Sequence, residues 1–388
     1  MNFIMPPKAE RETWPNEGRP AYSWVVERRK HAPGLDDLLK WAYSLGASRI
    51  DFKTGHPVTI MVHGKVLFAT RHSTDDFAIS DIVSHMYAQD GMSMLAIYHD
   101  LDSAYSVSLN RRETLRFRVN FTPCEVMRGQ GVNIVMRPFP SRPPSLESQL
   151  VEPEVLASND IVSGMKLIGG VTGSGKTSLA FALAEEKVMR PNANCNIATG
   201  EHPIEFLMDY IRSPTGSKIT QTPIHPPHMT FAKFVRGTTR REMTELIVGE
   251  CRDSETMDAA INCAITGGIL GTTIHADNVG LMMQRAVSLC AREERDNLVS
   301  ALAQSMRFCL NQRLLPRKGG GRVAIREFLT FDRDLRFKLM RTDPQCWPEF
   351  INDVLKTDGQ SFARAIEARL EQDLITEEVA LMAKRRDD

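Results

Sequence analysis

The sequence lacks the features typical of membrane-spanning, secreted and nucleic-acid-binding proteins. Its 388 residues contain no run of about 20 apolar residues, the length that crosses a bilayer. The first twenty residues have no apolar core of the signal-peptide type. Basic and acidic residues number 48 each, whereas free-standing nucleic-acid-binding proteins usually have a basic excess, and only 7% of residues are aromatic. We expect a soluble, cytoplasmic protein without a transmembrane segment and without direct nucleic-acid binding.

Cysteine pairing is also missing from this chain. The seven cysteines are an odd number and include no C-x-x-C pair, so neither a disulfide framework nor a cysteine-rich zinc site is indicated. We predict reduced side chains that pack as small hydrophobic groups. The residues concerned are Cys124, Cys195, Cys251, Cys263, Cys290, Cys309 and Cys346.

The length of the chain and one proline-rich stretch predict its domain organisation. A chain of 388 residues is long enough for two or three domains. Residues 140–155 are rich in proline, which interrupts helices and strands, and we interpret them as a linker. Residues 1–33 are polar and proline-containing and are predicted to be a flexible or docking arm. This leaves a first domain at 34–139 and a second at 156–388.

The first domain shows the pattern of a small α+β fold. Residues 35–45 have apolar side chains at helical spacing. Residues 49–68 alternate in polarity like paired strands, with His63 and Gly64 at the position of a hairpin turn. The strand pattern continues through residues 104–123 and 131–139, which predicts an antiparallel sheet.

The second domain has the rhythm of a parallel α/β sheet, in which short apolar strands alternate with helices. Its predicted strands are residues 165–170, 193–200, 244–250 and 267–276. Beyond about residue 290 the pattern becomes helical. Phe362, Ile366, Leu370 and Leu374 are spaced four apart on one helix face. We interpret this helix as a packing helix, with partner binding as the alternative.

A glycine-rich loop in the second domain carries the clearest chemical signal. Gly170, Gly175, Lys176 and Thr177 match the pattern G-x-x-x-x-G-K-[ST] between a predicted strand and a predicted helix. In such a loop backbone N–H groups surround phosphate oxygens, the lysine contacts the terminal phosphates and the threonine hydroxyl binds Mg²⁺. We predict an ATP site with Mg²⁺. The predicted binding residues are Gly170, Thr172, Gly173, Ser174, Gly175, Lys176, Thr177 and Ser178.

Acidic and polar residues follow other predicted strands of the same sheet. Glu250 ends one strand, where an acid lies beside a phosphate loop and can hold the Mg²⁺ shell or orient the attacking water. Glu201 and Glu205 follow another strand and are further candidates for these roles. His275 follows a third strand, at the position of a γ-phosphate sensor, although a lone histidine is more often structural.

Two arginines complete the candidate set from the residues alone. Arg236 and Arg240 are four apart and are predicted to lie on one helix face, with Arg241 beside them. An arginine that neutralises developing charge accelerates phosphoryl transfer by about 10³ to 10⁵. The alternative is that they belong to a solvated basic face.

Four motifs in order resemble the type II/type IV secretion ATPase superfamily, whose members include the twitching-pilus retraction motors. They are the Walker A loop GGVTGSGKTS, the acidic box GEHPIEF, the Walker B strand LIVGECRD and the histidine box AITGGILGTTIHADN. The stretch NQRLLPRKGGGRVAIREFL and several N-terminal segments also resemble the family, so the similarity spans about residues 34–385. Details such as GEHPIEFLMD resemble the ATPases of Dot/Icm-type and IncI conjugation-type systems, the type IVB branch.

The resemblance implies a RecA-like P-loop motor domain joined to a smaller PAS-like α+β N-terminal domain, assembled as a hexameric ring. It implies that Glu250 is the Walker B glutamate, Glu205 the acidic-box glutamate and His275 the histidine-box residue. Arg236 and Arg240 match the two arginines between acidic box and Walker B. By the same resemblance, the N-terminal Arg118 and Arg137 match arginines that reach the γ-phosphate in relatives.

The sequence departs from the family pattern at three places. His202 stands where the acidic box commonly has aspartate, which removes one carboxylate from the surroundings of the metal. Met243, Thr244 and Glu245 replace the usual D-P-D before Walker B. The tetracysteine zinc site of some pilus-assembly members is missing, which favours the retraction-like and type IVB branch.

These observations together predict a cytoplasmic, ATP-hydrolysing ring motor of a type IV (IVB) secretion or conjugation apparatus, in which hydrolysis is coupled to domain movement. Its expected partners are further copies of itself and the inner-membrane and cytoplasmic components of that apparatus, through which it is held near the membrane. The alternatives are a nucleotide-gated docking platform with little turnover, a RecA-like DNA translocase and a P-loop kinase or transferase. The cargo is not indicated.

Overall fold

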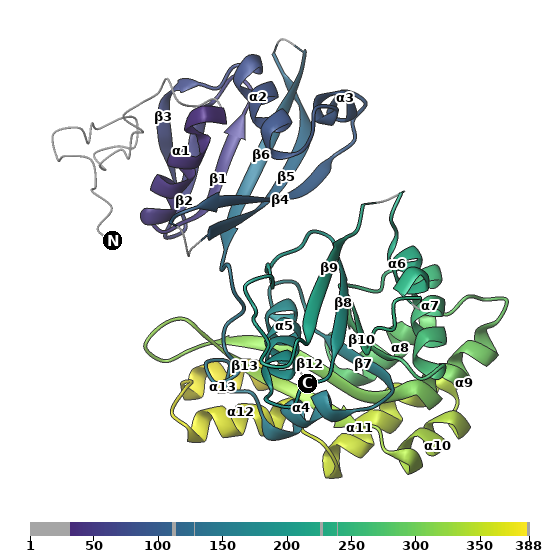
Figure 1. Ribbon diagram of the computed structural model, residues 1–388. Coiled ribbons are helices and arrows are strands. Elements are labelled where there is room, and N and C mark those ends of the chain that lie inside the picture. The colour runs from purple at the N-terminus through teal and green to yellow at the C-terminus, as the bar shows by residue number, and fades with distance from the viewer. Residues whose placement is uncertain (1–31, 111–113, 128, 226–227, 239, 386–388) are drawn as a thin grey trace. The chain divides into compact units, whose positions relative to one another are not determined.

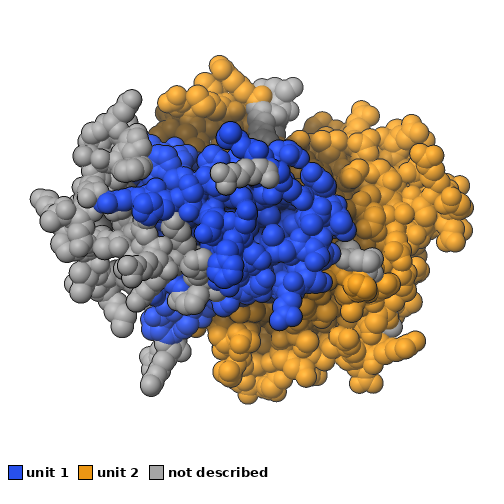
Figure 2. Space-filling view, turned by 90° about the horizontal axis from the view of Figure 1, so that it is seen from above, with its two compact units in different colours: residues 1–141, 203–205 blue, residues 142–202, 206–388 orange. Residues whose placement is uncertain are grey.

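The computed structural model describes residues 32–110, 114–127, 129–225, 228–238 and 240–385. The chain forms two compact units, one of residues 1–141 with 203–205 and one of residues 142–202 with 206–388 (Figure 2). Most of the arm predicted at residues 1–33 lies outside the described residues. The fold class is mixed α/β, as predicted, and each unit is built around its own sheet (Figure 1).

The first unit contains a six-stranded antiparallel sheet in the order β3-β2-β1-β6-β5-β4. His63 and Gly64 have φ angles of 49° and 76° between β2 and β3, which confirms the predicted hairpin turn. Apolar residues of the sheet and its helices form one core. The elements are α1 (Ala32–Ser44), β1 (Ala47–Lys53), β2 (Pro57–Val62), β3 (Lys65–Ser73), α2 (Asp76–Met86), α3 (Gly91–Ala96), β4 (Leu101–Ser108), β5 (Thr114–Val126) and β6 (Gly129–Phe139).

The second unit contains a seven-stranded sheet in the order β13-β12-β7-β11-β10-β8-β9. All neighbouring strands are parallel except β12 and β13, which form a hairpin. The strands are β7 (Gly164–Gly169), β8 (Asn196–Glu201), β9 (Lys218–Pro223), β10 (Glu245–Val248), β11 (Ile269–Ile274), β12 (Met306–Pro316) and β13 (Arg322–Thr330). The four predicted strands correspond to β7, β8, β10 and β11.

Helices connect and cover the strands of the second unit (Figure 1). They are α4 (Pro153–Ala157), α5 (Lys176–Met189), α6 (Phe231–Thr238), α7 (Ser254–Ile265), α8 (Val279–Leu289), α9 (Arg295–Ser305), α10 (Arg333–Arg341), α11 (Trp347–Thr357), α12 (Phe362–Glu371) and α13 (Glu377–Lys384). Phe362 and Ile366 of α12 are buried against Val323 and Ile325 of β13, so α12 is a packing helix, as predicted.

The prediction that the chain is helical beyond about residue 290 was wrong for residues 306–330. These residues form the hairpin β12–β13, which extends the parallel sheet beside β7. Most side chains of both strands are buried on both faces, and the buried residues include polar ones such as Asn311, Gln312 and Arg326. The sequence therefore lacks the alternation of apolar and polar residues that indicates a half-buried strand. The turn is marked by Gly319, Gly320 and Gly321, all with positive φ.

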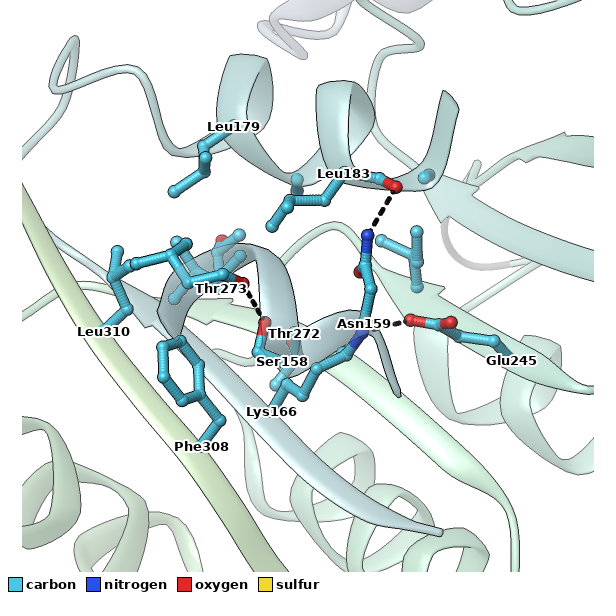
Figure 3. A pocket seen from close by; sticks show the side chains of 16 residues that line it. Ser158, Asn159, Lys166, Leu179, Leu183, Glu245, Thr272, Thr273, Phe308 and Leu310 are labelled. Atoms are coloured by element: carbon cyan, nitrogen blue, oxygen red, sulfur yellow. Dashed lines mark hydrogen bonds and ion pairs between the residues drawn. The ribbon is translucent and has the colours of Figure 1, made fainter. Parts of the chain in front are cut away.

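A buried ion triad joins three elements at the amino end of the parallel strands. Glu245, the first residue of β10, accepts from Lys166 Nζ of β7 at 2.5 Å and from Lys187 Nζ of α5 at 2.7 Å. All three side chains are at most 15% exposed. Lys166 and Glu245 also line a cavity of about 30 Å³ between α5 and the sheet, near Asn159 (Figure 3). The triad therefore ties the strand and helix on either side of the glycine-rich loop to the strand that leads to Glu250.

Five cysteines of the second unit are buried, as predicted, and Cys124 of the first unit is half-buried. The prediction of a packing role was wrong for Cys346, which is exposed. None of the helices within the described ranges is both long and apolar enough to span a membrane.

Candidate nucleotide site

The glycine-rich loop runs from the end of β7 to the start of α5. Gly170, Gly173 and Gly175 have φ angles of 138°, 79° and 85°, which are conformations that residues with a Cβ rarely adopt. The loop wraps around the N-terminus of α5, where unpaired N–H groups and the helix dipole favour an anion. The 14-residue helix α5 begins at Lys176, so this is the geometry of a phosphate-binding loop.

The loop is packed against a glutamine that sequence reasoning did not select. A Cβ added to Gly170 would lie 2.4 Å from the carbonyl oxygen of Gln312, and one added to Gly175 would lie 2.8 Å from its Nε2. Gln312 Nε2 donates to the carbonyl oxygen of Ser174 at 2.6 Å. The glycines are thus required by steric contact as well as by φ, and Gln312 fixes the back of the loop.

Lys176 is buried within the loop. Its Nζ donates to the carbonyl oxygens of Gly170 at 2.7 Å and Val171 at 3.0 Å. Thr177 and Ser178 follow in the first turn of α5 and are half-buried. An ammonium group, a hydroxyl and helix N–H groups therefore converge at one end of one helix, which suits a polyphosphate.

The neighbouring strands end at the same edge of the sheet as the loop. The N–H of Gly249 donates to the carbonyl oxygen of Gly200 at 2.8 Å, and that of Cys251 to Thr273 at 3.0 Å. Thr273 Oγ1 donates to the carbonyl oxygen of Gly249 at 2.5 Å. These bonds hold the segments that carry Glu201, Glu250 and His275 in register, because all three follow or end parallel strands.

Glu250 lies one residue beyond Val248–Gly249 at this edge. Its side chain is 15% exposed, and Oε2 accepts from Arg252 Nε at 2.6 Å. Because Arg252 is 68% exposed, the ion pair is open to solvent and can rearrange. Glu250 and Lys176 both act electrostatically on the ring of His275, with opposite effects on its pKa.

His275 is exposed and follows β11 directly. Burial of its ring and the charge of Lys176 lower its pKa below the usual 6.5, against the opposing effect of Glu250. A hydrogen bond between the ring and the backbone of Gly170 also raises this pKa. The net lowering favours the neutral ring at pH 7, and the ring follows β11 at the same edge of the sheet as the glycine-rich loop.

Glu201 has a different environment from Glu250. It is buried at 4% exposure, and its Oε1 accepts from Thr199 Oγ1 at 2.6 Å and from Gln221 Nε2 at 2.8 Å. This carboxylate serves a buried hydrogen-bond network between β8 and β9 rather than pointing into solvent. The next residue, His202, lies with its Nδ1 2.7 Å from the carbonyl oxygen of Ile224.

The candidate arginines of the second unit, Arg236 and Arg240, do not lie on one helix face. Arg236 forms an ion pair with Glu255 of α7, and both side chains are more than half exposed. Helix α6 ends at Thr238, so the prediction that Arg240 lies on the same helix face was wrong; Arg240 is exposed in the turn that follows. Gly237 within the last turn and a chain reversal at Arg241, whose N–H donates to Thr238, explain the early end.

The remaining candidates belong to the first unit. Arg118 of β5 and Arg137 of β6 are direct cross-strand partners, and both are exposed on one face of the sheet. Glu205 lies in the segment 203–205 of this unit, where its carbonyl oxygen accepts from Arg116 Nε at 3.1 Å. The structure thus brings Arg118 and Arg137, two of the predicted site residues, side by side.

A cleft of about 180 Å³ beside the glycine-rich loop contains further polar groups that sequence reasoning missed. Arg313 and Arg322 of the β12–β13 hairpin line it together with Thr172 and Gly173. The guanidinium of Arg313 stacks 3.9 Å from the ring centroid of Phe362, which fixes its plane. The signal that could have revealed them is the triple glycine at residues 319–321, which marks a turn between two strands.

Thr177 and Glu250 are the residues that could hold Mg²⁺. Mg²⁺ is usually held by one or two protein groups together with water and substrate phosphates, so a dedicated cluster of ligands is not needed. In the described ranges no group of three histidine, cysteine or acidic residues is arranged to hold a metal. The threonine hydroxyl at the loop and the carboxylate at the neighbouring strand end fit a metal that arrives with the nucleotide.

Comparison with known proteins gives one family. Residues 31–320 match the family model described as type II/IV secretion system protein. The "Type IV pilus retractation ATPase PilT" of Pseudomonas aeruginosa is 28% identical over 313 residues, which are 80% of this chain and 86% of that protein. The "Uncharacterized protein YggR" of Escherichia coli is 32% identical over 298 residues, which are 76% of this chain and 85% of that protein.

Solved structures show the same relationship. The X-ray structure of the Legionella pneumophila ATPase DotB is 31% identical, has a TM-score of 0.84 and covers 92% of this chain and 97% of its own. The crystal structure of the pilus retraction motor PilT with bound ADP has a TM-score of 0.76 and covers 90% of this chain. At 24% identity, that structure supports the fold alone.

Proposed function

Because the chain belongs to the family of type II/IV secretion system proteins, we propose that it is an ATPase motor that drives a secretion or pilus apparatus. The observation that carries the proposal is a complete phosphate-binding loop at the start of α5, with Glu250 and His275 following neighbouring parallel strands of the same sheet. A glycine-rich turn without a binding function would not need a lysine, a glutamate and a histidine at the same edge of the sheet.

The roles of the residues follow from their positions. Lys176 neutralises charge on the terminal phosphates when it exchanges its backbone partners for phosphate oxygens. Glu250 orients the attacking water, with help from Glu205, and His275 responds to the γ-phosphate as a neutral donor. Thr177 would hold Mg²⁺ through its hydroxyl, and the metal would supply positive charge to the phosphate oxygens. Arginines from the first domain or a neighbouring subunit complete the charge balance.

The finer assignment is a ring motor of a type IVB secretion or conjugation system. It is supported by the likeness to the ATPase DotB at 31% identity over almost the entire chain. Hexamer formation, a cytoplasmic location and contact with inner-membrane components belong to this proposal, as does the division into an N-terminal domain at 34–139 and a motor domain at 156–388. Pilus retraction is the second candidate, because the PilT relative covers 80% of the chain.

The first experiment is steady-state phosphate release from ATP as a function of protein concentration. Turnover per protomer should rise with concentration, because in a ring the site is completed by a neighbour. The blank is Glu250→Gln, which preserves the shape of the side chain and removes the carboxylate.

The outcomes separate the proposal from its alternatives. A concentration-dependent turnover that vanishes in the blank supports the motor. Turnover equal to the blank, in a protein that still binds ATP, would leave a nucleotide-gated platform. Stimulation of turnover by DNA would favour the translocase that the balanced charge argues against.

A further inference from the structure

A chain of buried polar side chains begins at the glycine-rich loop. Gln312 is 1% exposed and donates to the carbonyl oxygen of Ser174. Its Oε1 accepts from Arg326 Nε at 2.7 Å. Gln312 and Arg326 are direct cross-strand partners in the β12–β13 hairpin, so their side chains lie on the same face of the sheet.

Arg326 continues this chain to the proline-rich linker. It has no exposed surface, and its Nη1 donates to Glu152 Oε2 at 2.9 Å and to the carbonyl oxygen of Leu150 at 3.2 Å. Its Nη2 donates to the carbonyl oxygen of Gln149 at 3.0 Å. All donor nitrogens of this guanidinium are therefore used, one toward the loop and two toward the linker.

A second buried arginine, Arg369, binds two of the same linker residues. Arg369 of α12 donates through Nη2 to Glu152 Oε1 at 2.8 Å and to the carbonyl oxygen of Leu150 at 2.9 Å. Leu150 has φ of 50°, an unfavourable conformation for a residue with a branched side chain, and its carbonyl oxygen accepts from both arginines. Backbone strain of this kind persists only when the surroundings over-determine it.

The arrangement is more than an anchor for the linker, because each group has one partner toward the loop and one away from it. Because Gln312 is bonded both to Ser174 and to Nε of Arg326, a displacement of Ser174 by a bound phosphate would be passed through Gln312 to Arg326. Burial prevents water from replacing a broken bond at either arginine, so a change at one end is costly unless the other end moves.

We propose that Gln312 and Arg326 are positioning residues that transmit the nucleotide state of the glycine-rich loop to residues 149–152 of the linker. The inference rests on the function proposed above. Residues 149–152 lie in the second unit a few residues after its start at residue 142, so the state of the loop would reach the segment that follows the first unit. Coupling is reciprocal, and a change in the hold on the linker therefore alters nucleotide affinity by the same factor.

The test is hydrogen exchange at peptides covering residues 142–152, measured with and without saturating ADP. In the natural protein ADP should change exchange there by about fivefold or more, the lower end of typical coupling between sites. Gln312→Leu keeps a side chain of similar size and removes both hydrogen bonds. It should still bind a fluorescent ADP analogue while the linker response disappears. Arg364→Met is the matched control: the side chain of this exposed arginine of α12 donates to the backbone carbonyls of Gly359 and Lys356, and its loss should leave the response intact.

A second variant keeps the proposal testable if Gln312→Leu does not fold. Glu152→Gln keeps the size of the side chain and an accepting oxygen but removes the charge. It should weaken the linker response and shift the dissociation constant of ADP by the same factor. A linker response that survives Gln312→Leu, or a reduced response in Glu152→Gln without a matching affinity change, would overturn the coupling. A natural protein that binds no ADP would instead contradict the proposed function itself.

Discussion

The two ends of the parallel sheet in the second unit carry the same kinds of charged residue in opposite roles. At the carboxyl end, Lys176 begins α5 after the glycine-rich loop, and Glu250 lies in a loop beside the exposed Arg252. At the amino end, Lys166 and Glu245 are buried and bonded to each other, only ten and five residues away along the same segments. The residue types are identical, and the difference is the surroundings.

The comparison shows why only one end is suited to chemistry. The charge of Glu245 is satisfied by two lysines in a closed interior, so no ligand can approach it. Glu250 pairs with the exposed Arg252, and Lys176 donates to the neutral carbonyl groups of Gly170 and Val171. The amino end therefore holds the strands and α5 together, and the carboxyl end leaves its charges available for a phosphate and a metal.

The largest expected effect comes from removing the lysine at the carboxyl end. Lys176→Ala deletes the ammonium group that faces the terminal phosphates, and phosphoryl transfer depends almost entirely on such charge. Phosphate release should become undetectable and affinity for ATP should fall about a hundredfold, which isothermal titration would measure. The melting temperature should change little. Normal ATP affinity would contradict the assignment of the loop.

The glutamate at the same end should show a loss of rate without a loss of binding. Glu250→Gln removes the carboxylate that orients water, and general acid–base catalysis is typically worth about 10² to 10⁴ in rate. Turnover should fall by about 10³ while ATP affinity stays within about threefold, as measured by phosphate release and by titration. A variant with unchanged turnover would exclude Glu250 from the reaction.

The glutamate at the amino end should show the opposite behaviour. Glu245→Leu leaves Lys166 and Lys187 without their carboxylate in the interior, and removal of one partner from a buried pair costs about 3–5 kcal/mol of unfolding free energy. The double variant Lys166→Met/Glu245→Leu replaces the pair by apolar groups and should regain most of the loss. Urea unfolding measures both. Equal destabilisation in the two variants would show that the pair is not the cause.

Acid should weaken the amino end before it affects the glycine-rich loop. Burial opposes ionisation of Glu245, but the charges of Lys166 and Lys187 outweigh it and hold its pKa below the usual 4.5. A carboxyl with a lowered pKa stabilises the fold above its unfolded value, and this stability is lost as pH falls below 4.5 through the folded value. Urea unfolding at pH 7 and below pH 4.5 should show a smaller loss in the double variant than in the natural protein.

The smallest effect concerns the titration of His275. Its pKa is lowered by burial and by Lys176, and raised by Glu250. Lys176→Ala should therefore raise this pKa and Glu250→Gln should lower it further, as followed by the NMR signal of the imidazole ring. No change in either variant would separate His275 from the loop and from Glu250.

Short-range patterns in the sequence were sufficient for much of the fold. The glycine-rich loop, the strand ends with Glu250 and His275, the hairpin at His63 and the packing face of α12 were all predicted, because each depends on residues within one or two turns of chain. Long-range contacts were not accessible in this way. The β12–β13 hairpin was missed since its two buried faces show no alternation, and with it the role of Gln312.

The sequence by itself determined that this chain has a phosphate-binding loop and that its motifs are those of the secretion ATPases. Only the tertiary structure decided which charged residues are buried in ion pairs and which remain open. Glu201 and Glu250 have similar sequence contexts, yet Glu201 is closed off by Thr199 and Gln221. The physical reason is that burial and pairing depend on strands brought side by side from distant parts of the chain, which no local pattern records.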